Sequence, residues 1–360
     1  MILFISGEYP PDVGGVGDYT LRLRLALHER GHATSVLTRR DVKRWDARSL
    51  ISIMGAAPTR GIVHIQYQPA AFDLLGDICL VPVLMALFRR RVRSVITFHD
   101  VRVPYLFPGA GRLRQAAVRL LARSSNAVIA ADTRDLELLR TQSKCVLHIP
   151  IGSNISRSPP ADYERRAFRA RLGLQDDDLA IVYFGLLNWS KGVDLLLDAF
   201  ELVRARTPRA RLFVLGGTSG VSDPTDRDTA ARLRSRLARA GDALIRPGWL
   251  NPVELSAYLL TADVALLPYV DGASARRGSL LACAEHGLPI VSTQPAGAEV
   301  TPFIEAEEPD AVRLAEAVAR VHASPERLRG ASRDLAQQVS WPRIAGLHVD
   351  LYNTLLYSRR

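Results

Sequence analysis

One lysine is unusual in a chain that carries nearly all of its positive charge on arginine. The sequence has 44 arginines and three lysines, and Lys191 is the lysine of its second half. It follows an apolar run, in Phe184-Gly185-Leu186-Leu187-Asn188-Trp189-Ser190-Lys191-Gly192. The compact charge of a lysine suits a diphosphate. We therefore predict that Lys191 binds a phosphorylated ligand; a chance lysine at a surface turn is the alternative.

A second cationic segment, residues 268–281, also follows an apolar run. It reads Pro-Tyr-Val-Asp271-Gly-Ala-Ser-Ala-Arg276-Arg277-Gly278-Ser279-Leu280-Leu. The apolar residues after Gly278 predict a helix, and the free N–H groups at a helix N-terminus bind anions. The arginines and the amides near Gly278, Ser279 and Leu280 would hold phosphate, and Asp271 would accept hydrogen bonds from sugar hydroxyls. A capped helix with a solvated arginine pair is the alternative.

Two motifs in the first half of the chain also lie at the ends of apolar runs. Gly14-Gly15-Val16-Gly17 follows the first run and opens a helical pattern, so Gly15 and Gly17 could let the backbone approach a phosphate or a sugar hydroxyl. His99-Asp100 ends another run and should project from a strand end. A tight turn and a structurally satisfied histidine are the respective alternatives.

The elements that must position these residues form a repeated strand–helix pattern. Predicted strands are 2–6, 34–38, 62–66, 94–99, 127–131 and 146–150, and then 179–184, 211–215, 244–247, 264–268 and 289–292. Predicted helices include 20–30, 113–123, 134–141, 192–206, 229–240, 252–260, 280–286 and 311–323. Continuous apolar strands, each followed by a helix, indicate parallel sheets covered on both faces. Residues 151–160 read as a linker, so we expect two doubly wound α/β domains with ligands beyond the strand ends.

Charge separates the two halves. Residues 1–155 hold 21 Lys and Arg against 12 Asp and Glu, whereas residues 156–360 hold 26 against 25. The chain has no zinc-finger or RNA-recognition signature, so nucleic acid is not an expected partner. The basic first half instead fits a phosphorylated acceptor or an anionic membrane, with Arg89-Arg90-Arg91-Val92-Arg93 as the candidate contact. A solvated helix end is the alternative.

The sequence also indicates where the protein is located and whether it needs a cofactor. The three cysteines are scattered, the first strand lacks the basic start of a signal peptide, and the longest apolar run is about half a membrane span. We expect a cytoplasmic protein, with peripheral contact at the inner membrane face as a further prediction. The acidic clusters read as solvated loops, so we expect neither a metal site nor a cofactor.

Together these motifs resemble the retaining glycosyltransferases of family 4, which have the GT-B fold. The likeness rests on Gly14–Gly17, His99-Asp100, Ile149–Asn154, Gly185…Lys191-Gly192, Ala262–Pro268, Gly287–Val291 and a closing helix over 341–357. The family implies two Rossmann-like domains facing across a cleft. Here these would be an acceptor domain (1–155), a nucleotide-sugar domain (156–340) and a last helix (341–360) that crosses back to the first.

Two departures from the family pattern concern the donor site. The usual arginine is replaced by Leu186, and the places of the usual glutamate pair hold Ser274 and Ala282. We expect Arg276 or Arg277 to replace that arginine, Asp271 to replace the sugar-binding glutamate, and Glu285 to substitute weakly at the ribose.

The resemblance implies a metal-independent retaining glycosyltransferase, and a hexose as the transferred sugar. Lys191 and Arg277 would neutralise the leaving diphosphate, and His99 would shape the site near the sugar. A lipid-linked or cell-envelope glycan is the expected acceptor. The alternatives are a non-catalytic relative that binds a sugar nucleotide or a partner transferase, and a nucleotide-sugar epimerase.

Overall fold

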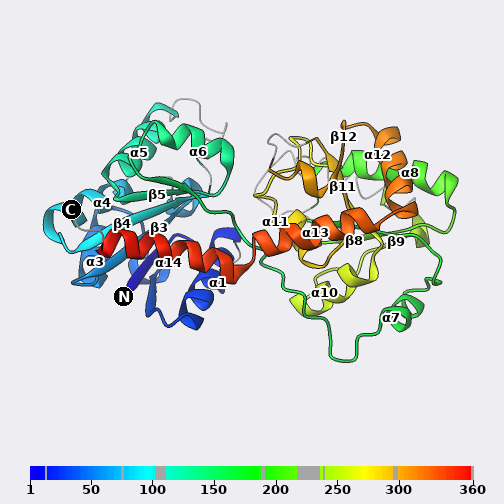
Figure 1. Cartoon of the computed structure of the whole chain (residues 1–360), viewed down its shortest axis with the longest axis horizontal. Coiled ribbons are helices and arrows are strands. Elements are labelled where there is room, and N and C mark those ends of the chain that lie inside the picture. Colours follow the sequence, from blue (N-terminus) through cyan, green and yellow to red (C-terminus); the bar gives the residue numbers. More distant parts are fainter. Residues whose placement is uncertain are drawn as a thin grey trace. The chain divides into compact units, whose positions relative to one another are not determined.

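The computed structural model describes residues 1–12, 14–73, 77–99, 101, 111–185, 187, 191–216, 236–237, 240–294 and 299–357, with only the backbone of 111–114. The chain forms two compact units. The first unit combines Met1–Asn154 with Val339–Arg360, and the second unit is Ile155–Gln338. The closing helix α14 (Trp341–Tyr357) is therefore part of the first unit, where it packs beside α1 (Gly15–Glu29) (Figure 1).

The first unit contains a six-stranded sheet in which every described pair is parallel, in the order β2-β1-β3-β4-β5-β6. Its strands are β1 (Ile2–Ser6), β2 (Thr34–Leu37), β3 (Gly61–Tyr67), β4 (Val92–Phe98), β5 (Ala127–Ala130) and β6 (Val146–His148). Its other helices are α2 (Arg39–Val42), α3 (Ala47–Ala56), α4 (Val81–Phe88), α5 (Gly111–Ser124) and α6 (Thr133–Arg140).

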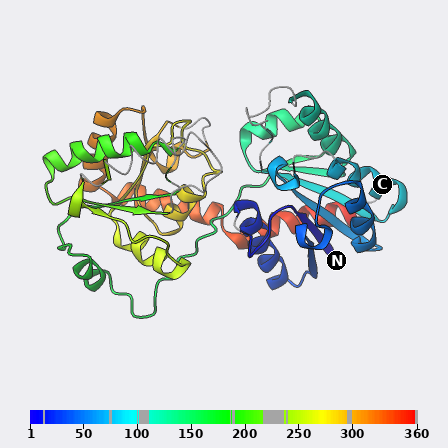
Figure 2. The same ribbon diagram turned by 180° about the vertical axis from the view of Figure 1, so that it is seen from behind.

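Alternating side chains of β1 explain why helices cover both faces of this sheet. Ile2 and Phe4 join a core with α1 and α14, whereas Leu3 and Ile5 join a separate core with α3 and α4. Successive strand residues point to opposite faces, so a strand that is apolar throughout must be buried on both sides. Figure 2 shows the resulting layers from behind.

The second unit repeats this architecture with the strand order β12-β11-β10-β7-β8-β9, again all parallel. Its strands are β7 (Ala180–Phe184), β8 (Arg211–Leu215), β9 (Leu244–Ile245), β10 (Val264–Leu267), β11 (Ile290–Thr293) and β12 (Glu305–Glu307). Its described helices are α7 (Arg165–Arg171), α8 (Val193–Arg206), α10 (Pro252–Thr261), α11 (Gly278–Glu285), α12 (Ala311–Ala323) and α13 (Glu326–Gln338).

These sheets confirm the predicted α/β class of two doubly wound parallel sheets. Every predicted strand is present, and the structure adds β12 and the helices α2, α3, α4, α7 and α13, which the sequence pattern did not reveal. The predicted helix over 229–240 falls almost wholly outside the described residues. Among the helices that the structure does describe, none is long and apolar enough to cross a bilayer.

Candidate functional site

The predicted phosphate-binding residues of the second unit meet where its strand order reverses. From β7 the chain builds β8 and β9 on one side, and then returns to build β10, β11 and β12 on the other. Such a switch point, beyond the strand ends, is where open α/β sheets bind ligands. Lys191 follows β7, and the segment 268–279 follows β10, the strand paired directly with β7. Residues 186 and 188–190 lie outside the described part, and so does the Leu186 departure.

Gly192 brings these two segments into contact. Its φ of 69° is in the left-handed region, and a Cβ atom there would lie 1.7 Å from the carbonyl oxygen of Pro268. No side chain fits at that distance, because the obstacle is backbone. Gly192 therefore lets the turn that carries Lys191 lie directly against the segment that follows β10.

Tyr269 lies at the centre of the resulting cation cluster and was missed by the sequence analysis. The Lys191 Nζ atom is 5.3 Å from the centre of the Tyr269 ring, and Cζ of Arg277 is 4.6 Å from it. Both distances are typical of cation–π contacts. The tyrosine hydroxyl shares a hydrogen bond of 2.7 Å with Oγ of Ser279. The aromatic ring thus supports two cations at once and ties them to the start of α11.

The two cations repel each other, and Lys191 shows the effect. Burial, and then the Arg277 charge, lower the pKa of Lys191 from 10.5 to about 8, against a smaller opposing effect of Asp271. A bound dianion would reverse the second effect and favour the ammonium. The cluster is therefore arranged for a ligand with negative charge.

Asp271 holds Arg277 in place. Its carboxylate is 69% exposed and forms an ion pair with the largely buried Arg277 guanidinium. Arg277 thus has one partner that faces water and one aromatic partner that is buried. The predicted role of Asp271, binding sugar hydroxyls, would require its carboxylate to be shared with Arg277.

The N-terminus of α11 completes the site. The helix has Arg277 at its N-cap and no side-chain capping bond, so its first amides are not satisfied by the cap residue. No heavy atom lies within 4 Å of the Cβ position at Gly278, which leaves open space above the backbone. The Leu280 side chain is fully buried, so this residue can contribute only its backbone amide to a ligand.

The remaining predicted donor residues make no described contact with Tyr269. Arg276 is half-buried and directly precedes Arg277. Glu285 ends α11, about 10 Å along the helix axis from Gly278. Ser274 and Ala282, at the usual places of the glutamate pair, are both buried. Neither position offers a carboxylate, and the role of Glu285 at a donor ribose stays a prediction.

In the first unit, His99 directly follows β4 and joins a buried polar network. Its Nε2–H donates to the Oε1 atom of Gln66 at 2.8 Å, since a carboxamide oxygen can only accept. The Gln66 Nε2 atom faces Nε2 of His64 at 3.4 Å. The His64 ring also bonds to the hydroxyls of Thr97 at 2.8 Å and Tyr352 at 2.6 Å.

This network determines the protonation state of His99. Burial, and then the nearby His348, lower the pKa of His99 to about 3. Gln66 fixes the remaining proton on Nε2, so Nδ1 is an acceptor. His99 can therefore orient a ligand hydroxyl, but it cannot serve as a proton donor near neutral pH. Gln66 was missed in sequence, and Asp100 lies outside the described residues.

The glycine turn of the first unit begins α1 with two different glycines. A Cβ at Gly17 would lie 3.0 Å from the backbone of Tyr9, whereas a Cβ at Gly15 would meet nothing within 4 Å. Gly17 therefore serves packing, and Gly15 leaves the turn open to a ligand. Burial, and then Asp18 and Asp12, raise the pKa of the neighbouring Glu8 carboxyl. These carboxylates favour a hydroxyl over a phosphate here.

Within the described ranges, no three His, Cys, Asp or Glu side chains gather closely enough to hold a metal ion.

Comparison with known proteins places this geometry in context. The family profile described as "Glycosyl transferases group 1" matches residues 178–324. A D-inositol 3-phosphate glycosyltransferase of Kineococcus radiotolerans is 32% identical over 305 residues, covering 71% of this chain and 68% of that protein. The Streptomyces griseus enzyme of the same name is 30% identical over 226 residues, covering 59% of this chain and 46% of its own length. The chain thus spans about half the length of the latter relative.

A solved structure agrees on the fold. HepE from Anabaena, crystallised with UDP and glucose, has a TM-score of 0.72 at 14% identity, over 98% of this chain and 99% of that one. At this identity the likeness concerns the fold, which is of the GT-B class. The Kineococcus relative exceeds 30% identity and is matched over two thirds of its length, so the sequence shows the family as well as the fold. The chain belongs to the glycosyl transferases of group 1.

Proposed function

We propose that this protein transfers a hexose from a nucleotide-diphosphate sugar to an acceptor, with retention of configuration and without a metal ion. The observation that supports it most strongly is the pair of cations, Lys191 and Arg277, over one tyrosine ring at the switch point of the second unit. Departure of the nucleotide diphosphate is the difficult step of glycosyl transfer. Fixed cations and helix amides lower that barrier without reorganising during the reaction.

Each group has a distinct role in this proposal. Lys191, Arg277 and the amides of Gly278 to Leu280 neutralise the diphosphate, and Arg276 adds charge beside them. His99, neutral and with Nδ1 as acceptor, orients a hydroxyl of the transferred sugar. We assign no protein nucleophile, because in the proposed same-face attack the leaving phosphate takes the acceptor proton.

We further propose that the acceptor carries a phosphate. The relatives are named for inositol 3-phosphate, and the first half of the chain is strongly basic. Two sources share this chemistry: a small phosphorylated polyol or sugar, and a lipid-linked glycan at the inner membrane face. The free thiols of Cys79, Cys145 and Cys283 support a cytoplasmic location for either reaction.

A panel of nucleotide sugars tests the donor assignment by thermal shift. We expect one donor class to raise the melting temperature of the protein, and Lys191→Ala to lose that stabilisation. Turnover with inositol phosphate, hexose phosphates and lipid-linked acceptors then separates the acceptor sources. If no sugar nucleotide stabilises the protein, the transferase assignment is wrong.

The rival is a non-catalytic member of the family, and the buried Ser274 and Ala282, which offer no carboxylate to a ribose, favour it. Such a protein would be stabilised by a donor without turning it over in the presence of any acceptor. Release of a rearranged sugar without acceptor would instead indicate an epimerase.

A further inference from the structure

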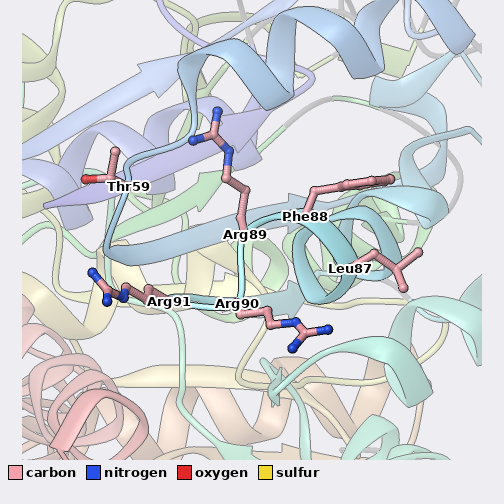
Figure 3. A pocket seen from close by; sticks show the side chains of 6 residues that line it. All are labelled: Thr59, Leu87, Phe88, Arg89, Arg90 and Arg91. Carbon is pink, nitrogen blue, oxygen red and sulfur yellow. The ribbon is translucent and has the colours of Figure 1, made fainter.

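We propose that the first unit docks on an anionic lipid bilayer through a surface at the turn between α4 and β4. This arginine corner comprises Thr59, Leu87, Phe88, Arg89, Arg90 and Arg91, which line an open pocket of about 470 Å³ (Figure 3). The proposal concerns association only, and it stands whether or not the protein is a transferase.

The arginine corner combines exposed apolar groups with exposed charge. Phe88 is 71% exposed and Leu87 is 61% exposed, at the last turn of α4. Arg90 and Arg91 follow at once and are exposed. Figure 3 shows the apolar side chains to one side of the turn and the arginines spread around it. Apolar residues that enter the acyl boundary beside cations that meet phosphate headgroups are what binds a protein to a membrane interface.

The charge of this region is mainly positive. Residues 47–99 contain six arginines and two aspartates, and Asp73 is paired with Arg39 outside the arginine corner. Arg89 is held by the Met54 carbonyl of α3 at 3.0 Å, and Arg93 by the Leu355 carbonyl of α14 at 3.2 Å. The exposed Ile51 lies on α3, which packs against α4. The surface is therefore built on three helices and is complementary to an anionic partner.

Exposed apolar side chains decide between anionic partners. A nucleic acid or an acidic peptide would pair with the arginines and leave Phe88 and Leu87 in water. An anionic bilayer binds the arginines at its headgroups and buries the two apolar side chains. The arginine corner precedes β4, and His99 follows it, so the two are about 23 Å apart along the strand. Docking would then leave the edge with His99 in water, and an acceptor held in the same bilayer would have to extend that far.

Vesicle co-sedimentation of the full chain, with no nucleotide sugar present, tests the proposal. We expect binding to phosphatidylcholine–phosphatidylglycerol vesicles, weakening with salt, and none to phosphatidylcholine alone. Arg90→Gln with Arg91→Gln should weaken the partition coefficient about thirtyfold, since each arginine near an anionic surface contributes about fivefold. Phe88→Ala should weaken it about tenfold.

The matched control is Lys43→Gln with Arg44→Gln. It removes two exposed charges from the chain that follows the edge strand β2, whereas the arginine corner precedes the interior strand β4. It should change binding less than twofold relative to the unmodified protein, although it removes the same net charge as the double variant of the arginine corner. Equal losses from both double variants, or tight arginine-dependent binding of a DNA duplex with none to anionic vesicles, would overturn the proposal.

Discussion

Raising the pH from 7 to 9 should weaken the binding of a nucleotide sugar, because Lys191 loses its proton within this range. The pKa of Lys191 is lowered to about 8. About nine tenths of its side-chain amine is therefore protonated at pH 7, and about one tenth at pH 9. If the diphosphate binds only the protonated form, the affinity falls about tenfold between these values. The sign follows from the charge: a dianion prefers the ammonium, and its binding takes up a proton near pH 8.

Titration calorimetry with UDP-glucose at pH 7, 8 and 9 measures this effect. Lys191→Arg is the matched control, because a guanidinium stays charged across the range. We take the ratio of the affinity of the unmodified protein to the affinity of the Lys191→Arg variant at each pH. Effects of titrating groups on the ligand or elsewhere in the protein cancel in this ratio. We expect the ratio to change about tenfold from pH 7 to pH 9. A ratio that does not change with pH would refute the assignment of Lys191 to the diphosphate.

Three further changes test the supporting structure. Gly192→Ala should lower the free energy of unfolding by at least about 3 kcal/mol. Gly173→Ala is the control, because Gly173 has a similar φ but open space around its Cβ position, and it should cost about 1 kcal/mol; denaturant unfolding measures both. Gln66→Met should lower kcat about tenfold and release the His99 proton to either ring nitrogen, which nitrogen-15 NMR detects; an unchanged tautomer would contradict the network. Asp271→Asn removes the ion pair of Arg277, so it should raise the affinity for UDP by up to about fivefold while turnover falls. A loss of both UDP affinity and turnover would instead show that Asp271 only positions Arg277.

The sequence predicted the sheets well because buried parallel strands are continuous apolar runs. The helices it missed are explained by composition. The α4 helix has eight residues, and its sequence Val-Pro-Val-Leu-Met-Ala-Leu-Phe is apolar throughout, so it shows no helical periodicity. The β12 strand reads Glu-Ala-Glu and is only half-buried at the sheet edge, so it has no apolar run to detect.

The sequence identified a site residue where its type is rare in the chain. It did not identify residues whose role depends on contacts between distant parts of the chain. Lys191 was visible because lysine is rare in this chain. Tyr269 lies within a segment already singled out, but its place under two cations depends on Gly192 meeting Pro268, a contact between residues far apart in sequence. Gln66 left a weaker signal, as the second of two polar residues, after His64, on one face of an apolar strand.

Under the proposed function, the cation cluster would act in catalysis as well as in binding. Folding holds Lys191 beside Arg277 despite their repulsion, so part of the electrostatic work is done before a ligand arrives. A diphosphate relieves that repulsion in the ground state already, which by itself would only tighten binding. When the bond to the sugar breaks, however, the departing diphosphate gains a further negative charge on the oxygen that carried the sugar. In the proposed assignment Lys191 and Arg277 lie beside that oxygen, so they would stabilise the transition state more than the bound donor, and this difference would accelerate the reaction.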